Sequence, residues 1–212
     1  MAAMLKGKVF DYRALRLLMG AIALSMPFVV RALAGESLPS ISASYYTAAR
    51  DSFVGMLFVV GAFLWAYNGH TPSEGNASRV AALAALCVAV FPTTCSDCQA
   101  TPVSWIHYIA AVILFSILAY FCLGPFRERT KGQPGKKGRR AKIYFVCGWT
   151  IILCMLAAVL AKAVLPADLA DKLEVTFWAE AIALVAFGVA WITAGKFIPL
   201  LVDDSEALRV FR

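Results

Sequence analysis

The sequence predicts an all-α fold, a polytopic transmembrane helical bundle of six spans that forms a single integral-membrane domain over residues 1–212. Three observations lead to this prediction. The chain is 61% hydrophobic and only 16% charged, whereas soluble domains carry roughly 25% charged residues. Its apolar segments approach the length of about 20 residues that crosses a bilayer. Its basic residues gather between alternate segments, and the short loops leave no room for a separate soluble catalytic or DNA-binding domain.

The six expected spans cover residues 15–34, 45–68, 80–94, 103–124, 143–165 and 175–198. The first follows basic residues and ends at Ala32-Leu33-Ala34, which resembles the cleavage motif of a signal peptide. Its apolar run of about 18 residues, and the charge of Arg31 directly before the motif, favour an uncleaved span instead. The second segment is apolar over most of its length, which predicts a span.

The third segment has only about 15 apolar residues before Pro92, fewer than the roughly 17 that a span usually needs. Ala81, Ala85 and Ala89 nevertheless share one helical face, and small residues at this spacing let membrane helices approach closely. We therefore count it as a span. The fourth and fifth segments are long apolar runs, and the sixth carries a second face of small residues. That face consists of Ala179, Ala183, Ala186, Ala190 and Ala194.

The basic residues predict the orientation of the chain. Most of them precede the first span, lie in the second or fourth connection, or follow the last span. These are Lys6, Lys8, Arg13, Arg16, Arg79, Arg127, Arg129, Lys131, Lys136, Lys137, Arg139, Arg140, Lys142, Lys196, Arg209 and Arg212. Because basic loops stay in the cytoplasm, we expect both termini there, in a multi-pass protein of the plasma (inner) membrane.

The basic segment 126–142, which contains Gly-Gln-Pro-Gly, is expected to be a flexible cytoplasmic loop. Its simplest role is that of a topological anchor. Alternatively it binds anionic lipid headgroups, because each Lys or Arg near an anionic surface contributes about 1 kcal/mol. No aromatic residues alternate with these charges as a nucleic-acid platform requires, so membrane lipids are the expected partners and nucleic acid is not.

Ionisable residues inside the apolar segments mark the candidate site. An aspartate at the centre of a membrane helix costs roughly 2.5–3.5 kcal/mol, so such a residue pairs, faces water or has a function. At 1.5 Å per residue, Asp51, His107 and Glu180 lie about 9, 6 and 8 Å below the outer ends of their spans. This common depth predicts an outward-facing polar pocket. Its expected ligand-binding residues are Tyr46, Arg50, Asp51, His107, Lys162 and Glu180.

Three interpretations of this cluster remain open. In the first, Arg50 or Lys162 pairs with Asp51 or Glu180 to hold three helices together. In the second, cations bind an anionic headgroup while apolar walls hold the chains of an amphipathic ligand. In the third, two carboxylates and His107 form a metal or acid–base centre. The only other histidine, His70, is expected on the opposite side, so we expect no bound metal or cofactor.

The cysteines favour a structural role. Cys95 and Cys98 form a CxxC pair in an outer loop, and we expect a disulfide there because that side faces an oxidising compartment. A redox-active pair, as in quinone-linked disulfide-forming membrane enzymes, is the alternative, but those enzymes need a second reactive pair. The cysteines inside the spans are expected to be small packing residues. They are Cys87, Cys122, Cys147 and Cys154.

The element Pro39-Ser40-Ile41-Ser42 in the first outer loop adds a family resemblance. Together with six short-looped spans, it resembles the membrane family of GPI-lipid-remodelling and autophagy-modulator proteins, and also small bacterial membrane proteins of unknown function. The resemblance implies a lipid-related accessory role. We therefore expect a protein that binds, senses or handles a lipid or other amphipathic molecule. The alternatives are a metal- or acid–base-dependent intramembrane lipid hydrolase and a structural or accessory subunit of a membrane complex.

Overall fold

A computed structural model describes residues 12–94 and 100–203 of the chain, and all regular secondary structure in these ranges is helical. The long helices are α1 (Tyr12–Ala34), α2 (Arg50–Ala66), α3 (Pro72–Val90), α4 (Pro102–Phe121), α5 (Gly135–Val164) and α7 (Val175–Gly195). The short elements are the 3-10 helix η1 (Ser42–Tyr46), the π-helical turn η2 (Cys122–Phe126), helix α6 (Ala167–Lys172) and the 3-10 helix η3 (Pro199–Leu201). The predicted all-α class is confirmed.

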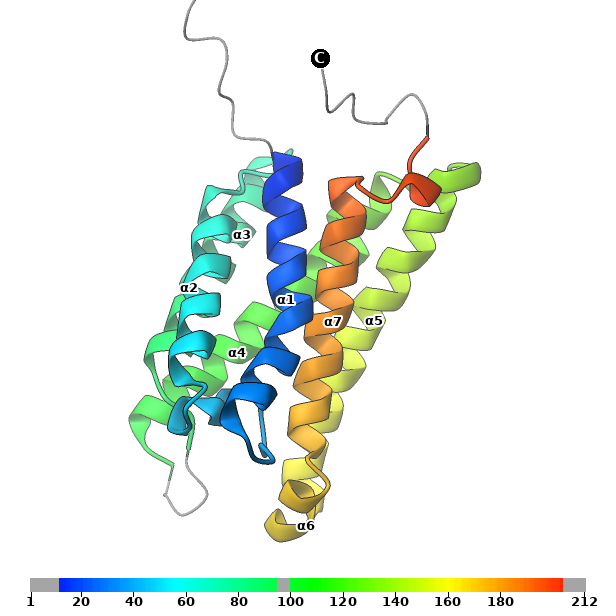
Figure 1. Cartoon of the computed structure of the whole chain (residues 1–212). Coiled ribbons are helices and arrows are strands. Elements are labelled where there is room, and N and C mark those ends of the chain that lie inside the picture. The colour runs from blue at the N-terminus through cyan, green and yellow to red at the C-terminus, as the bar shows by residue number, and fades with distance from the viewer. Residues whose placement is uncertain (1–11, 95–99, 204–212) are drawn as a thin grey trace, which may run out of the picture.

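The six long helices form a closed ring in which each helix packs against two others. Successive long helices run in opposite directions, and α7 packs against both α1 and α5, which closes the ring (Figure 1). One end of the ring, here named the basic end, holds the start of α1, the end of α7 and the α2–α3 and α4–α5 connections. The α1–α2 connection, the segment between α5 and α7, the end of α3 and the start of α4 lie at the opposite end. The alternation of direction agrees with the predicted order of the segments.

Four helical segments are long and apolar enough to cross a membrane, which supports the predicted class of membrane protein. They are residues Arg13–Ala34, Pro102–Phe126, Gly135–Val164 and Val175–Gly195. Helix α2 has 17 residues, and α3 begins with two polar turns before its apolar part.

The side chains are distributed as expected for helices that face lipid. The outer face of α5 exposes large apolar side chains such as Val146, Leu153 and Leu160. Small residues lie where helices of the bundle meet: Ala183 and Ala190 of α7 are fully buried. Membrane helices associate through such small residues because lipid already solvates the large apolar ones. The predicted alanine faces are therefore the faces that pack, including Ala81, Ala85 and Ala89 of α3, which are at most 1% exposed.

A close helix contact joins α1 and α7 at two glycines. A Cβ atom added to Gly188 would lie 2.7 Å from the carbonyl oxygen of Gly20, and one added to Gly20 would lie 2.8 Å from the carbonyl oxygen of Gly188. Real Cβ atoms do not approach backbone atoms this closely. The two backbones touch here only because both residues lack a side chain.

The helix boundaries differ from the predicted spans in two places that affect the site. Helix α2 begins at Arg50 rather than Tyr45, because the serine-rich approach forms η1 and a turn instead. The basic segment expected to be a loop over 126–142 is only partly a loop, since α5 already begins at Gly135. Its first two turns carry several of the cations. The predicted disulfide of Cys95 and Cys98 lies outside the described residues.

The glycine contact leads to a test of the ring. We expect Gly188→Ala to lower the thermal stability of the protein in detergent, by the roughly 1–3 kcal/mol typical of overpacking, because α1 and α7 must separate. The matched control is Gly55→Ala, since Gly55 also lies within a helix but an added Cβ there meets nothing within 4 Å. That control should be neutral or stabilising by about 0.5–1 kcal/mol. Equal unfolding temperatures for the two variants would contradict the contact.

Candidate functional site

Glu180, the central residue of the predicted pocket, binds main-chain groups. Its Oε2 atom accepts hydrogen bonds from the backbone N–H of Ile41 at 2.7 Å and of Ser42 at 3.4 Å. The N–H of Phe177, also on α7, donates to the carbonyl of Pro39 at 3.1 Å. The carboxylate therefore caps the start of η1 and fastens the loop between α1 and α2 onto α7. This role is structural, but the partners of Glu180 are backbone N–H groups rather than the cation that the first interpretation expects.

Three other predicted site residues join a polar layer at the same end of the bundle. His107 is 2% exposed, and its Nδ1 atom lies 2.7 Å from the carbonyl oxygen of Phe91, which makes Nδ1 the donor. The Tyr46 hydroxyl donates to the carbonyl of Thr93 at 2.5 Å. The Thr93 hydroxyl in turn donates to Tyr108 at 3.1 Å.

Lys162 completes this layer from α5. Its Nζ atom lies 4.7 Å from the centre of the Tyr108 ring. Its charge acts electrostatically on His107 and Glu180 as well. Four predicted site residues therefore lie in one region: Tyr46, His107, Lys162 and Glu180. Their contacts in this region join loops to helices.

Arg50 and Asp51 do not join this layer, because α2 starts later than predicted. Both are exposed residues in the first turn of α2, where an acidic side chain is favourable to the helix dipole. Arg50 lies over the ring of Tyr45 at 4.3 Å and donates to its hydroxyl at 2.8 Å. Neither needs a buried counter-charge.

The sequence reasoning missed an ion pair at this end. Arg31 and Glu174 form a two-point contact at 2.7 and 3.0 Å, which joins the end of α1 to the start of α7. Glu174 adopts a left-handed backbone conformation with φ 49° directly before α7. In the described ranges, no three His, Cys, Asp or Glu residues are grouped so that they could hold a metal ion.

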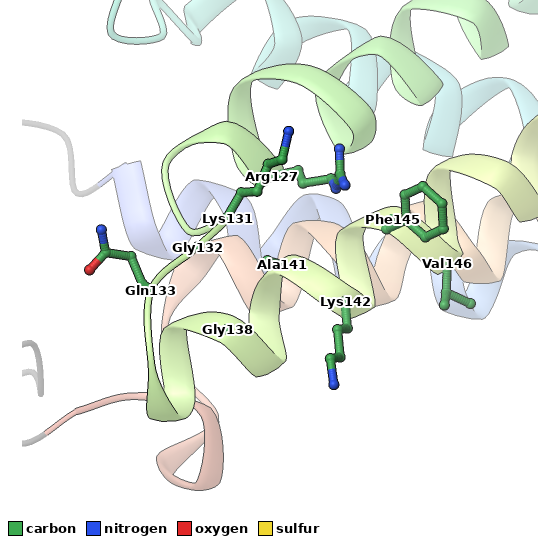
Figure 2. A pocket seen from close by; sticks show the side chains of 9 residues that line it. All are labelled: Arg127, Lys131, Gly132, Gln133, Gly138, Ala141, Lys142, Phe145 and Val146. Atoms are coloured by element: carbon green, nitrogen blue, oxygen red, sulfur yellow. The ribbon is translucent and has the colours of Figure 1, made fainter.

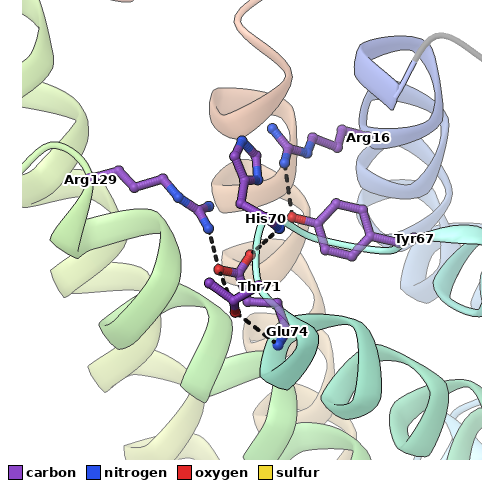
Figure 3. A network of polar contacts seen from close by, with 6 residues as sticks. All are labelled: Arg16, Tyr67, His70, Thr71, Glu74 and Arg129. Atoms are coloured by element: carbon purple, nitrogen blue, oxygen red, sulfur yellow. Dashed lines mark hydrogen bonds and ion pairs between the residues drawn. The ribbon is translucent and has the colours of Figure 1, made fainter.

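A second polar network lies at the basic end and is centred on Glu74. Thr71 and Glu74 form the start of α3: the Thr71 hydroxyl accepts from the Glu74 N–H at 3.3 Å. The Glu74 carboxylate accepts from the Thr71 hydroxyl, from the backbone N–H of His70 and from Arg129, with which it forms an ion pair. Figure 3 shows Arg129 reaching this carboxylate from the α4–α5 connection. The network therefore joins the α2–α3 and α4–α5 connections.

Arg16 of α1 enters the same region from the other side (Figure 3). Its guanidinium donates to the Tyr67 hydroxyl at 2.9 Å and to the carbonyl of Ala194 at 2.8 Å. It also lies over the rings of Tyr67 and Phe126, at 5.2 and 5.6 Å. Beneath it lies a cluster of aromatic rings in edge contact, which includes Trp191.

The electrostatic environment shifts the pKa of two groups in this network. Burial raises the pKa of the Glu74 carboxyl, but the hydrogen bonds from Arg129, the His70 N–H and Thr71 outweigh this, so the net pKa is lowered. Partial burial lowers the pKa of His70, and the neighbouring cations Arg129 and Arg16 lower it further. At neutral pH Glu74 is therefore charged and His70 is neutral.

Two cavities open at the basic end, on the two sides of the first turns of α5. We name the larger one the groove. It has a volume of about 490 Å³ and is lined by Arg127, Lys131, Gly132, Gln133, Gly138, Ala141, Lys142, Phe145 and Val146. Figure 2 shows cationic side chains around this groove, with Phe145 and Val146 on the next turn of α5. Phe145 and Val146 are exposed and lead into the lipid-facing surface of α5.

We name the second cavity the inner pocket. It has a volume of about 170 Å³ and is lined by Arg16, His70, Phe126, Arg129, Thr130, Lys137, Arg140, Tyr144, Ala194 and Lys196. None of the described residues that line either cavity is acidic. The basic end therefore has two cavities with a positive lining, built in part from the segment 126–142 that the sequence predicts to be a flexible loop. Comparison with protein-family models, with curated proteins and with solved structures finds no match.

The Glu74 network and the cations beside it left only a partial signal in the sequence. Thr71 and Glu74 have the spacing of a helix capping box, and this signal could have located the start of α3 at Pro72. The cations on α5 were visible as a basic run. Nothing in the sequence indicated which of them face inward, because that depends on where α5 begins.

The Glu74 network leads to a pH-dependent prediction. Glu74→Gln should destabilise the protein at pH 7 by about 1.5–3 kcal/mol, the value typical of hydrogen bonds to a charged group. The folded-state pKa of Glu74 is lowered. The stabilisation of the fold by the charged Glu74 carboxylate is therefore fully present above the unfolded-state pKa of about 4.3. It is lost as the pH falls through the folded-state pKa. Thermal unfolding in detergent should be measured between pH 7 and pH 3. The difference in stability between Glu74→Gln and the unmodified protein should shrink as the pH falls.

The control for this test is Glu128→Gln. Glu128 is 60% exposed and its ion-pair distances are 3.8 and 3.9 Å, and exposed pairs of this kind contribute little. This variant should behave like the unmodified protein at every pH. A gap for Glu74→Gln that stays constant down to pH 3 would mean that the carboxylate charge does not stabilise the fold.

Proposed function

We propose that this chain is a six-span membrane protein, with both termini in the cytoplasm, that binds anionic phospholipid in the groove beside α5. The observation that carries the proposal is the composition of the groove. Three cations lie at its rim, and an exposed apolar wall continues from it along α5. A phospholipid has the same order of groups, with a charged phosphate next to apolar chains. The lipid-binding role expected from the sequence is thereby assigned to the basic end.

The topology is supported by the ring itself. Helices α2 and α3 complete the ring between α1 and α4, and they expose apolar side chains such as Phe58, Val59 and Leu83 on their outer faces. At 1.5 Å per residue α2 is about 25 Å long, a little short of the roughly 30 Å hydrocarbon core. The segment before it, which includes η1, extends the protein at that end. Six alternating spans bring most described cations to the basic end, which by the positive-inside rule faces the cytoplasm.

The chemistry of the groove favours a phosphate headgroup over a neutral one. Arg127 and Lys131 come from the α4–α5 connection and Lys142 from α5. Glu128 partly offsets the first two, at 3.9 and 3.8 Å, but both pairs are loose and exposed. The Arg127 guanidinium lies 4.8 Å from the centre of the Phe145 ring, so the charged and apolar parts of the groove are adjacent. The volume of about 490 Å³ lies within the range of about 300–1,000 Å³ found for ligand sites.

An intramembrane hydrolase in the polar layer of the opposite end is less favoured. His107, the candidate base or ligand, uses its Nδ1 atom to bind the carbonyl of Phe91. Glu180 is engaged by two backbone N–H groups. These contacts explain why the fold keeps both residues without assigning either a reaction.

The proposed topology is tested by labelling single cysteines in whole cells, in a background where Cys95 and Cys98 are replaced by serine. Gln133→Cys, in the α4–α5 connection, should react with a membrane-impermeant maleimide only after permeabilisation. Asp171→Cys, an exposed position in α6 at the opposite end, should react in intact cells. The reverse pattern would place the basic end outside and would contradict the proposal.

The groove is tested by lipid-dependent stability of the purified full-length chain in a neutral detergent. Phosphatidylglycerol should raise the unfolding temperature and phosphatidylcholine should not; at about 100 times its Kd, a ligand adds roughly 2.7 kcal/mol. Arg127→Gln/Lys142→Gln should weaken phosphatidylglycerol binding by roughly 30-fold, because each cation near the headgroup contributes about 1 kcal/mol.

The control for the groove is Arg79→Gln/Arg139→Gln. These two residues are exposed cations at the same end that do not line the groove, so the double variant loses the same charge. It should keep nearly full affinity for phosphatidylglycerol. An equal loss of affinity in both double variants would show that lipid responds to the overall charge of this surface rather than to the groove.

A further inference from the structure

The chain that follows α7 is fastened to the first turn of α5. The Nζ atom of Lys136 donates hydrogen bonds to the carbonyl oxygens of Pro199 at 3.2 Å and of Val202 at 2.8 Å. Helix η3, drawn in red in Figure 1, packs against α5, and the Val202 side chain is only 5% exposed. We name residues 198–202 the strap. The strap therefore holds the same helical segment that forms one wall of the groove.

The first two turns of α5 lack the residues that normally stabilise a helix start. No side chain caps the helix at Pro134, and no acidic residue lies in its first turn. Gly138 lies inside these turns, and glycine is a poor helix former. Cations occupy this region instead, although the positive end of the helix dipole repels them. They are Lys136, Lys137, Arg139 and Arg140. The local sequence therefore disfavours the helical conformation seen here.

The groove depends on the position of these turns. Gly138, Ala141 and Lys142 line it from α5, and Gln133 lines it from the α4–α5 connection. A Cβ atom added to Gly138 would lie 2.5 Å from the carbonyl oxygen of Gln133, so the helix and the connection meet directly at the groove. If the start of α5 unwinds, the groove loses one of its walls.

From these observations we propose that the strap, held by Lys136, keeps the first turns of α5 helical and thereby sets the affinity of the groove for anionic phospholipid. The lipid part rests on the proposed function, whereas the support of α5 by the strap does not. Lys136 does not line the groove, so it acts as a positioning residue. The two carbonyl dipoles place partial negative charge beside its ammonium group. This charge offsets the unfavourable interaction of Lys136 with the helix dipole.

Hydrogen–deuterium exchange tests the support of α5 in the purified full-length chain, in neutral detergent without lipid. The readout is the exchange rate of the backbone amides of residues 139–142, which helical hydrogen bonds protect, corrected for the intrinsic rate of each sequence. Lys136→Gln should raise this rate about fivefold or more, because the turns open more often. Lys136→Arg keeps a charged donor and should stay within about twofold of the unmodified chain.

The charge-matched control is Arg139→Gln. Arg139 is an exposed cation in the same two turns and lines neither cavity. Its removal relieves a repulsion with the helix dipole, so exchange at residues 139–142 should stay unchanged or become slower. Lys136→Gln removes the same charge from the same helix end, yet its expected effect has the opposite sign. Equal acceleration in both variants would indicate a response to charge and would overturn the role of the strap.

The strap is tested from its other side by Val202→Ser, with Leu200→Ser as the control. Val202 is 5% exposed and Leu200 is 76% exposed, and neither substitution changes a charge. Val202→Ser should accelerate exchange at residues 139–142 about threefold or more, and Leu200→Ser should not. The double variant Lys136→Gln/Val202→Ser should exchange little faster than the faster single variant, because both changes release the same contact and their effects do not add.

The consequence for the groove is measured as the affinity of the same variants for phosphatidylglycerol in neutral detergent. Lys136→Gln and Val202→Ser should each weaken binding about threefold or more, because the open form of α5 must refold before lipid binds. Arg139→Gln and Leu200→Ser should keep nearly full affinity. Since Val202→Ser changes no charge, a loss of affinity in this variant cannot come from weaker electrostatic attraction.

Two further results would overturn the proposal. One is an exchange rate at residues 139–142 that is unchanged in both Lys136→Gln and Val202→Ser. The other is accelerated exchange in both variants with an unchanged affinity for phosphatidylglycerol. A different result separates this inference from the proposed function: if the unmodified chain does not bind phosphatidylglycerol, the groove function and the lipid part fail together. The exchange rates then still decide whether the strap supports α5.

Discussion

The close packing of α7 against both α1 and α5 is the constraint on which the rest of the structure depends. Without it, six antiparallel helices in sequence would form an open row rather than a ring. The packing is possible because α7 presents alanines and Gly188 where neighbouring backbones approach. In a membrane, such contacts gain from close backbone approach rather than from burying large apolar side chains. Large apolar side chains lie both on the outside of the ring, as on α5, and inside it, where Phe121, Phe187 and Trp191 are fully buried.

The polar residues have different roles at the two ends of the closed ring. At the opposite end, Glu180 and the Arg31–Glu174 pair fasten loops to α7, so the polar groups there are engaged in structure. At the basic end, the Glu74–Arg129 pair joins two connections, and the surrounding cations line cavities. Polar residues thus fasten loops at one end, and at the other they join two connections and line two cavities.

The features that depend on local periodicity could be predicted from the sequence. Apolar length and the alanine spacing of Ala81, Ala85 and Ala89 indicated the helices and the faces that pack, because a helix repeats every 3.6 residues wherever it lies. The start of α2 was misplaced because hydropathy does not register that residues 42–46 form a 3-10 helix. That error of five residues moved Asp51 from a predicted buried depth to an exposed first turn.

The partners of the polar residues could not be predicted in the same way. Glu180 binds the N–H groups of Ile41 and Ser42, and a main-chain donor leaves no mark in the residue types of a sequence. Arg129 and Glu74 are 55 residues apart, and their contact depends on how two connections meet after the ring has closed. Helix α5 begins at Gly135, eight residues before the apolar run. This early start decides which cations of the basic segment face inward, and the sequence did not indicate it.

The first turns of α5 have a mechanical consequence for the basic end. One helical segment is a wall of both cavities, with Lys137 and Arg140 on one side and Lys142 and Phe145 on the other. A helix turns as a rigid unit, so a rotation that brings this wall closer to one cavity carries it away from the other. Occupants of the two cavities would therefore influence each other. By thermodynamic linkage, the factor by which the first changes the affinity of the second equals the factor by which the second changes that of the first.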